Sequence, residues 1–130
     1  MAETPARRHE TSPPQAARFG LVFYVDEFDL PRSDPALAGR TVTINELFDS
    51  GPLYELADAV DAVSRGDRPE YEESINYTTL RVSPRHFQVL VRYPNMQQPA
   101  TELEGSLPEL RQLLDEWNAF CEQHPAPDGQ

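Results

Sequence analysis

Three carboxylates fall within four positions of the segment "YVDEFDLP", residues 24–31, directly after an apolar stretch. Asp26, Glu27 and Asp29 follow aromatic and β-branched residues, so we expect them where a strand ends and a loop begins. Carboxylates in such a place can bind a hard cation, transfer protons, steer a basic partner or simply face water. The ring of Phe28 lies among these acids, and an apolar ring in that setting favours a docking surface.

Two further groups of acids accompany aromatic residues in the same way. Glu55, Asp58 and Asp61 recur every three residues in a predicted helix, which places them along one exposed side. The segment "PEYEE", residues 69–73, supplies the other group. The predicted partner-binding residues are Asp26, Glu27, Phe28, Asp29, Tyr54, Glu55, Asp58, Asp61, Tyr71 and Glu72. The alternative is that these acids form ordinary solvated faces.

The sequence gives little support for a metal site, a cofactor site or a catalytic nucleophile. The histidines are His9, His86 and His124, and no two of them have the spacing of metal ligands. The segment "DEFD" lacks the glycine and the alternating acids of a calcium loop. The single cysteine, Cys121, falls on the apolar stripe of a helix and is predicted to be a small core residue. With no phosphate-binding or dinucleotide motif either, we predict no metal and no cofactor.

An enzyme or ligand-binding domain is the main alternative to a protein-binding protein. Acid–base catalysis requires two groups in unlike environments. Asp26 or Glu27 could provide one of them, and Tyr77, His86 or Arg92 from a predicted hairpin the other. Such a pocket would lie between the sheet and a loop over residues 26–39. Whether the chain is an enzyme stays open, and the sequence favours a non-catalytic role.

Charge and composition exclude several classes of partner. The formal net charge is −11, and all eleven basic residues are arginine. Nucleic acids and anionic membranes require a basic footprint, so neither is an expected partner, whereas a basic protein is. The lack of lysine suits a GC-rich bacterial genome. One cysteine, no apolar run long enough for a bilayer and no signal-like N-terminus predict a cytoplasmic protein.

Apolar periodicity predicts an α+β domain with a mostly antiparallel sheet of about four strands and two amphipathic helices on one face. The expected order is strand, strand, helix, strand, strand, helix. The strands are predicted over residues 18–25, 40–44, 74–82 and 86–93. The first helix begins at Asn45 or Ser50 and ends at Gly66, and a capping box of Ser106 and Glu109 begins the second. An acidic linker over residues 67–73 and a loop over residues 94–105 are also predicted.

Both ends of the chain are predicted to be disordered, since they carry prolines and charges but little apolar surface. The tails are residues 1–17 and 124–130, and a single domain covers 18–123. A small acidic domain of this kind fits an inhibitor or immunity-type protein, or an accessory or adaptor subunit, that docks on a basic protein. A self-associating subunit, for example a homodimer built through the hairpin edge or the helix of Trp117, is a further alternative.

Overall fold

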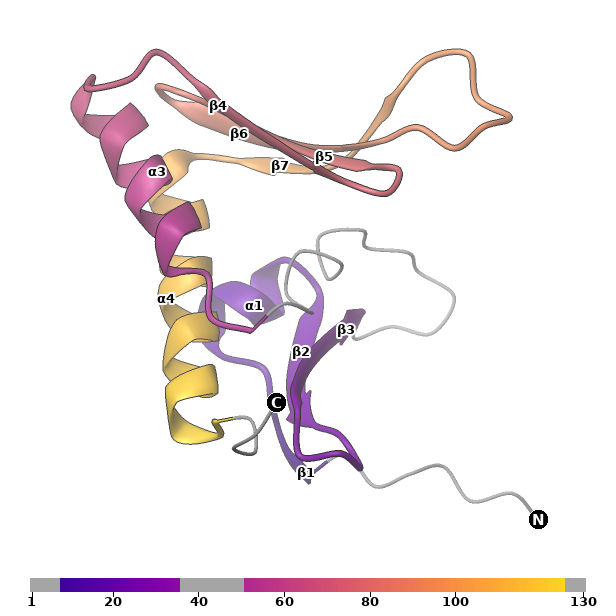
Figure 1. The fold of residues 1–130 in the computed structure, drawn as a ribbon, viewed down its shortest axis with the longest axis vertical. Coiled ribbons are helices and arrows are strands. Elements are labelled where there is room, and N and C mark those ends of the chain that lie inside the picture. The colour runs from indigo at the N-terminus through magenta and orange to yellow at the C-terminus, as the bar shows by residue number, and fades with distance from the viewer. Residues whose placement is uncertain (1–7, 36–50, 126–130) are drawn as a thin grey trace.

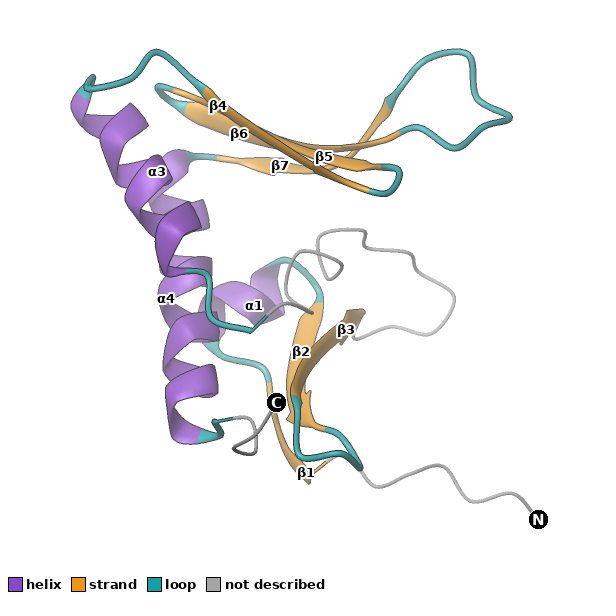
Figure 2. Cartoon of the chain, in the orientation of Figure 1, coloured by secondary structure: helices purple, strands orange, loops and turns teal. Residues whose placement is uncertain are grey.

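The computed structural model describes residues 8–35 and 51–125 of the chain. Within these ranges the chain forms a three-stranded and a four-stranded antiparallel sheet with helices packed beside them (Figures 1 and 2). The elements are β1 (Arg8–Thr11), α1 (Pro14–Arg18), β2 (Leu21–Val25), β3 (Pro31–Pro35), α3 (Tyr54–Arg65), β4 (Tyr71–Ile75), β5 (Thr78–Ser83), β6 (His86–Val91), β7 (Ala100–Gly105) and α4 (Leu107–Gln123). The predicted α+β class with packed helices and sheets is confirmed, with two sheets instead of one.

The three-stranded sheet is built around β2, which lies between β1 and β3. Apolar residues on both faces of β2 predicted this central position, and Leu21, Phe23 and Val25 are buried. The strand begins at Leu21 and not at Arg18. Arg18 ends α1, and Gly20 then reverses the chain with a φ of 74°.

The predicted disordered tail over residues 1–17 contains regular structure, because β1 and all but the last residue of α1 lie within that range. The Glu116 carboxylate on α4 accepts hydrogen bonds from the backbone N–H of Gln15 (2.9 Å) and Ala16 (2.8 Å). Strand β1 is fully exposed but pairs with β2 through its backbone. The hydrogen bonds to Glu116 span about a hundred residues of sequence, so local composition does not reveal them.

The predicted loop over residues 26–39 is wrong in its middle part, where Pro31–Pro35 form β3. Strand β3 carries a proline at each end and pairs in register with β2, from Val25 opposite Pro31 to Leu21 opposite Pro35. Prolines are tolerated on an edge strand, and the tight turn before β3 sets its pairing. The predicted strand at 40–44 and both predicted starts of the first helix, Asn45 and Ser50, lie outside the described residues.

The four-stranded sheet has the order β4-β5-β6-β7. The predicted hairpin is confirmed in β5 and β6, which pair from Ser83 opposite His86 to Thr78 opposite Val91. Residues 71–75, expected as a linker and the start of one long strand, form the separate strand β4. The chain turns at Asn76, whose φ is 54°, a conformation that asparagine tolerates. Strand β7 lies in the predicted loop at 94–105.

Both amphipathic helices are confirmed. Helix α3 begins at Tyr54 and ends before Gly66, which adopts the predicted left-handed C-terminal conformation with a φ of 84°. Helix α4 begins with the predicted capping box, in which Ser106 and Glu109 bond each other's backbone N–H. None of the described helices is both long and apolar enough to cross a membrane.

Helix α4 joins the two sheets into one core. The ring of Phe23 on β2 lies 5.1 Å from that of Trp117 and 5.7 Å from that of Phe120, measured between centroids. The N-terminal part of α4 packs instead against β6 of the four-stranded sheet, and α3 lies alongside α4 (Figure 1). The ring of Phe19, just after α1, contacts that of Phe87 on β6 edge to face. The core is therefore continuous between the sheets.

Candidate functional site

The acids of "DEFD" form a tight hairpin turn between β2 and β3. The Asp26 carboxylate accepts hydrogen bonds from the N–H of Phe28 (2.8 Å) and Leu30 (3.0 Å) and from Nε of Arg32 (2.9 Å). Burial raises the pKa of Asp26, but the bonds from Leu30, Arg32 and Phe28 outweigh it and hold that pKa below its usual range. Asp26 therefore acts as a structural residue of the turn.

Asp29 is also used inside the molecule. It adopts a left-handed conformation, with a φ of 63°, and its carboxylate pairs with the Arg8 guanidinium of β1. Arg8 bonds the carbonyl oxygen of Asp26 as well, at 2.7 Å. Glu27, Phe28 and Asp29 are all exposed at this turn, Phe28 to 67%, but the Asp29 carboxylate is held by Arg8. The turn keeps one acid and one ring of the predicted docking surface available.

Of the three acids of α3, one is also paired within the molecule and two are exposed. Asp61 accepts a hydrogen bond from Nε of Arg111 on α4 (2.9 Å), and Arg111 also pairs with Asp115. The hydrogen bond that Arg111 donates to Asp61 is the main reason why the pKa of Arg111 is raised. Glu55 and Asp58 are exposed, and neither forms an ion pair with another described residue. Asp61 therefore fastens α3 to α4, while the other two acids face solvent.

Helix α4 fixes the start of α3 through two hydrogen bonds. Asn118 Oδ1 accepts from the backbone N–H of Leu53 (2.6 Å), and Trp117 Nε1 donates to the carbonyl of Gly51 (2.9 Å). Tyr54 adds a third contact, since its hydroxyl lies 3.0 Å from Glu122 Oε1. The first turn of α3, which carries Glu55, is thereby held against a helix of the core.

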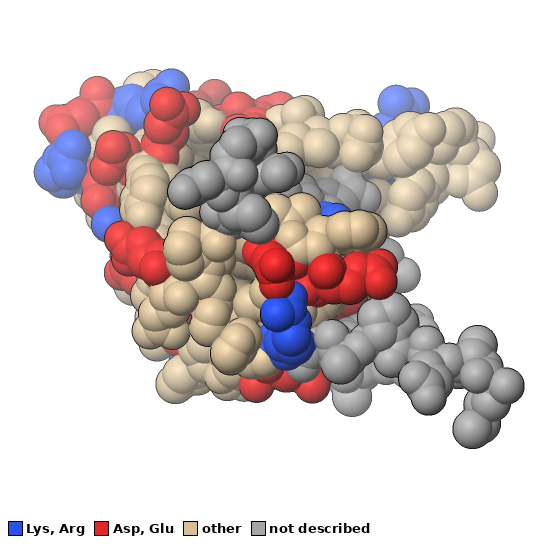
Figure 3. Space-filling model, turned by 60° about the horizontal axis from the view of Figure 1, so that its bottom comes forward, with Lys and Arg blue, Asp and Glu red and all other residues tan. Residues whose placement is uncertain are grey.

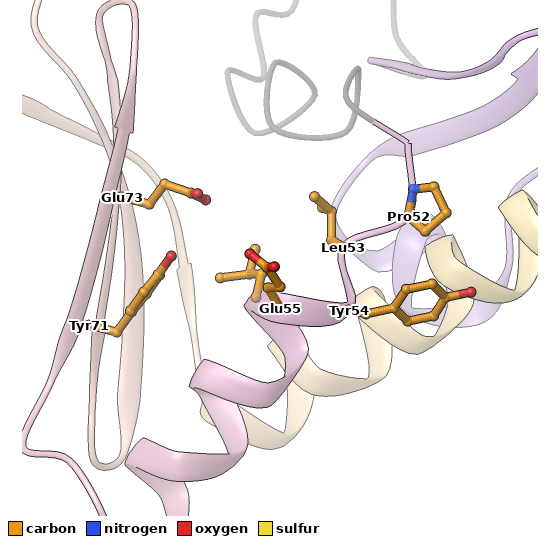
Figure 4. Close-up of a pocket in the computed structure, with 7 residues that line it drawn as sticks. Pro52, Leu53, Tyr54, Glu55, Tyr71 and Glu73 are labelled. Atoms are coloured by element: carbon orange, nitrogen blue, oxygen red, sulfur yellow. The ribbon is translucent and has the colours of Figure 1, made fainter. Parts of the chain in front are cut away.

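A hollow of about 400 Å³ lies between this first turn of α3 and strand β4. Its lining residues are Pro52, Leu53, Tyr54, Glu55, Leu56, Tyr71 and Glu73. In Figure 4, Glu55 from α3 and Tyr71 and Glu73 from β4 point into the space between the two elements. The ring of Tyr54 points away from β4, toward α4. We call this feature the α3–β4 hollow.

Glu73 belongs to the predicted acidic group "PEYEE" but was not among the predicted partner-binding residues. Its neighbour in β5 is Leu80, which is fully buried, so Glu73 occupies the core-facing side of the sheet. Strand alternation places Tyr71, Glu73 and Ile75 on that side, and Glu72 and Ser74 on the other. This alternation could have identified Glu73, had residues 71–75 been recognised as a strand. Glu72 faces outward and pairs with Arg81 at 3.4 Å.

Tyr71 is the central residue of the β4 wall. Burial, and then the negative charge of Glu73, raise the pKa of its phenol above the usual value. The hydroxyl therefore stays protonated at neutral pH and can donate a hydrogen bond. The Arg68 guanidinium lies over the ring, 5.1 Å from its centroid, as in a cation–π contact.

The predicted acidic patches are brought together only in part. Tyr54, Glu55 and Tyr71 line the α3–β4 hollow, whereas the turn at 26–30 lies at the other end of the molecule from β4 (Figure 1). In Figure 3, the acidic atoms on the visible face form separate groups, several of them beside basic atoms. The predicted partner-binding residues therefore do not form one continuous surface.

The residues considered for acid–base chemistry do not converge. The backbone N–H of Arg92 bonds the carbonyl of Tyr77 (3.0 Å) at one end of β6, while His86 begins that strand at the other end. Cys121 is buried, which raises the pKa of its thiol to about 12 and keeps it protonated. Among the described residues, no group of three or more His, Cys, Asp or Glu side chains could hold a metal ion.

Comparison of the chain with protein-family models, with curated proteins and with solved structures finds no match. The α3–β4 hollow is accordingly interpreted from its own residues.

Proposed function

We propose that this protein binds another protein, one with a basic surface, through the acidic face formed by α3 and β4. The observation that carries the proposal concerns Glu55 and Glu73, which line the hollow, and Asp58, which is exposed three residues after Glu55 on α3. None of the three has an ion-pair partner among the described residues. Elsewhere Asp26, Asp29 and other acids pair with arginines of the same chain. Unpaired carboxylates leave a negative field that attracts a basic partner.

The same face offers aromatic surface for contact. The side chain of Tyr54 is 49% exposed at the edge of the hollow, and Tyr71 is half-buried in its wall. Rings beside charges suit a docking surface, because rings supply contact area while charges speed the encounter and select the partner. An inhibitor or immunity-type protein, or an accessory subunit of a cytoplasmic complex, would use such a surface.

The Trp117 side chain is fully buried in the core, so it offers no surface of its own for self-association. A homodimer would have to use another surface, such as the hairpin edge. The net charge of −11 opposes contact between two copies of the acidic face. A basic partner is the better occupant of that face.

The proposal is tested by capturing partners from extracts of the organism that makes the protein. Three baits are compared: the natural protein, the variant E55Q/E73Q and the variant E102Q/E104Q. Both variants raise the net charge by two, but Glu102 and Glu104 lie on β7, at the opposite edge of the four-stranded sheet from β4. We expect a basic protein that the natural bait and the β7 variant retain and that E55Q/E73Q loses.

The recovered partner is then purified and titrated directly. Its dissociation constant should increase as salt is raised, because the attraction between exposed charges is screened. Equal recovery on all three baits, or a dissociation constant independent of salt, would contradict the proposal.

A further inference from the structure

We infer that the α3–β4 hollow receives the side chain of one arginine of the partner. The inference rests on the proposed function and specifies its anchor. The hollow has two opposed acidic residues, a phenol and apolar walls, and the three features together match the parts of an arginine side chain.

The charges of the hollow favour the binding of a cation. Glu55 stands on the first turn of α3 and Glu73 on β4, and both point into the same space (Figure 4). Neither carboxylate pairs with a basic side chain in the part of the chain that the structure describes. Two like charges that face each other repel, and a cation between them removes this repulsion and adds two attractions.

A charge on the inner side of an edge strand can also serve only to prevent unwanted strand pairing. Glu73 on β4, an edge strand, fits that explanation taken alone. It does not account for Glu55, which belongs to a helix and faces the hollow from the other side. The placement of the two acids on opposite sides of one hollow therefore indicates a ligand.

The walls of the hollow suit an aliphatic stem. Pro52, Leu53 and Leu56 line the α3 side, and the ring of Tyr71 lines the β4 side. Long basic side chains cover apolar surface with their methylene groups while the charged head bonds polar groups. The volume of about 400 Å³ lies at the lower end of the range for ligand pockets, which suits one side chain.

The arrangement favours arginine over lysine. A guanidinium has five N–H donors in a planar fork, so it can bond carboxylates on two different elements at once. It is also more weakly hydrated than an ammonium group, which lowers the cost of entering a half-open hollow. The protonated phenol of Tyr71, near Glu73, can orient that carboxylate toward the ligand.

The test uses three capped tripeptides of sequence Gly-X-Gly, in which X is arginine, lysine or citrulline. Citrulline has the shape of arginine without its charge. Each is titrated into the full-length isotope-labelled protein, and amide shifts are followed by NMR, which also reports whether variants remain folded. An oligolysine peptide serves as a probe of the acidic face in general.

We expect saturable shifts at residues 52–56 and 71–73 with the arginine peptide, and binding roughly threefold or more weaker with lysine. Citrulline should give no saturable shift. E55Q/E73Q should weaken arginine binding by roughly tenfold, and E102Q/E104Q should leave it unchanged.

Two other results would overturn the inference in distinguishable ways. If oligolysine shifts the amides around Glu55 and Asp58 while the arginine peptide shifts none around Glu73, the arginine pocket is wrong and the acidic docking face stands. If neither probe shifts residues of α3 or β4, the pocket and the proposed docking face are both wrong.

Discussion

At the scale of single residues, neighbouring acids in the sequence have different tasks. Asp26 holds a turn together with three hydrogen bonds, whereas Glu27 beside it is exposed. The sequence predicted that both residues would contact a partner. Sequence alone does not distinguish a loop carboxylate that accepts hydrogen bonds from the backbone from one that binds a partner. Only the turn geometry, with Asp29 in a left-handed conformation, separates the two.

Replacing Asp26 by alanine should destabilise the fold. The change leaves the N–H groups of Phe28 and Leu30 without their acceptor, and we expect a loss of about 1–3 kcal/mol in the free energy of unfolding. Urea denaturation measures this loss. Glu27→Ala in the same turn is the matched control and should change stability by less than about 0.5 kcal/mol. Equal effects of the two substitutions would refute a structural role for Asp26.

A histidine pair gives a second prediction at this scale. The rings of His9 on β1 and His124 at the end of α4 stack with centroids 4.3 Å apart, next to Arg8 and Asp29. Burial, and then the charge of His9, lower the pKa of His124 below 6.5. The unfolded state therefore binds more protons near pH 6, and the contribution of His124 to stability is lost as pH falls below 6.5.

This dependence is measured by urea denaturation between about pH 7.5 and pH 5. His124→Asn should flatten the decline of stability over that window. The contribution of Asp26 to stability falls in a different pH range. Because the pKa of Asp26 is lowered in the folded state, this contribution is lost only as pH falls below 3.8. An identical pH profile for the natural protein and the asparagine variant would show that the histidine contact does not act in this way.

At the scale of elements, local signals predicted some features and missed others. The apolar stripe and capping box of α4 and the hairpin of β5 and β6 were found because each has a strong local pattern. Strand β3, "PRSDP", has no apolar alternation and exists because the preceding turn sets it in register with β2. Strand β4 was obscured by its acids, and the hollow that it lines was missed with it.

The capping box permits a direct test of one confirmed element. Ser106→Ala removes the acceptor for the N–H of Glu109, and we expect a loss of about 1 kcal/mol in the free energy of unfolding. Ser106→Gly should cost only a few tenths of a kcal/mol relative to serine at this position. Chemical denaturation of the three proteins measures both. An alanine variant as stable as the natural protein would mean that the cap does not stabilise α4.

At the scale of the whole molecule, the arrangement of the core decides which acids can act together. Helix α4 joins the two sheets and holds the first turn of α3, so Glu55 meets Glu73 across the hollow. The turn at residues 26–30 lies far from them at the other end of the chain's fold (Figure 1). Net charge alone predicted a basic partner, but it could not predict which face would meet it.

The most direct test of the acidic docking face is site-specific photo-crosslinking in the cells that make the protein. A photoreactive amino acid is placed at Asp58, exposed on α3, and in a second strain at Glu27, exposed at the distant turn. We predict a crosslink to a basic protein from position 58 that E55Q/E73Q diminishes, and none to that protein from position 27. Crosslinks to a partner from position 27 alone would contradict the account.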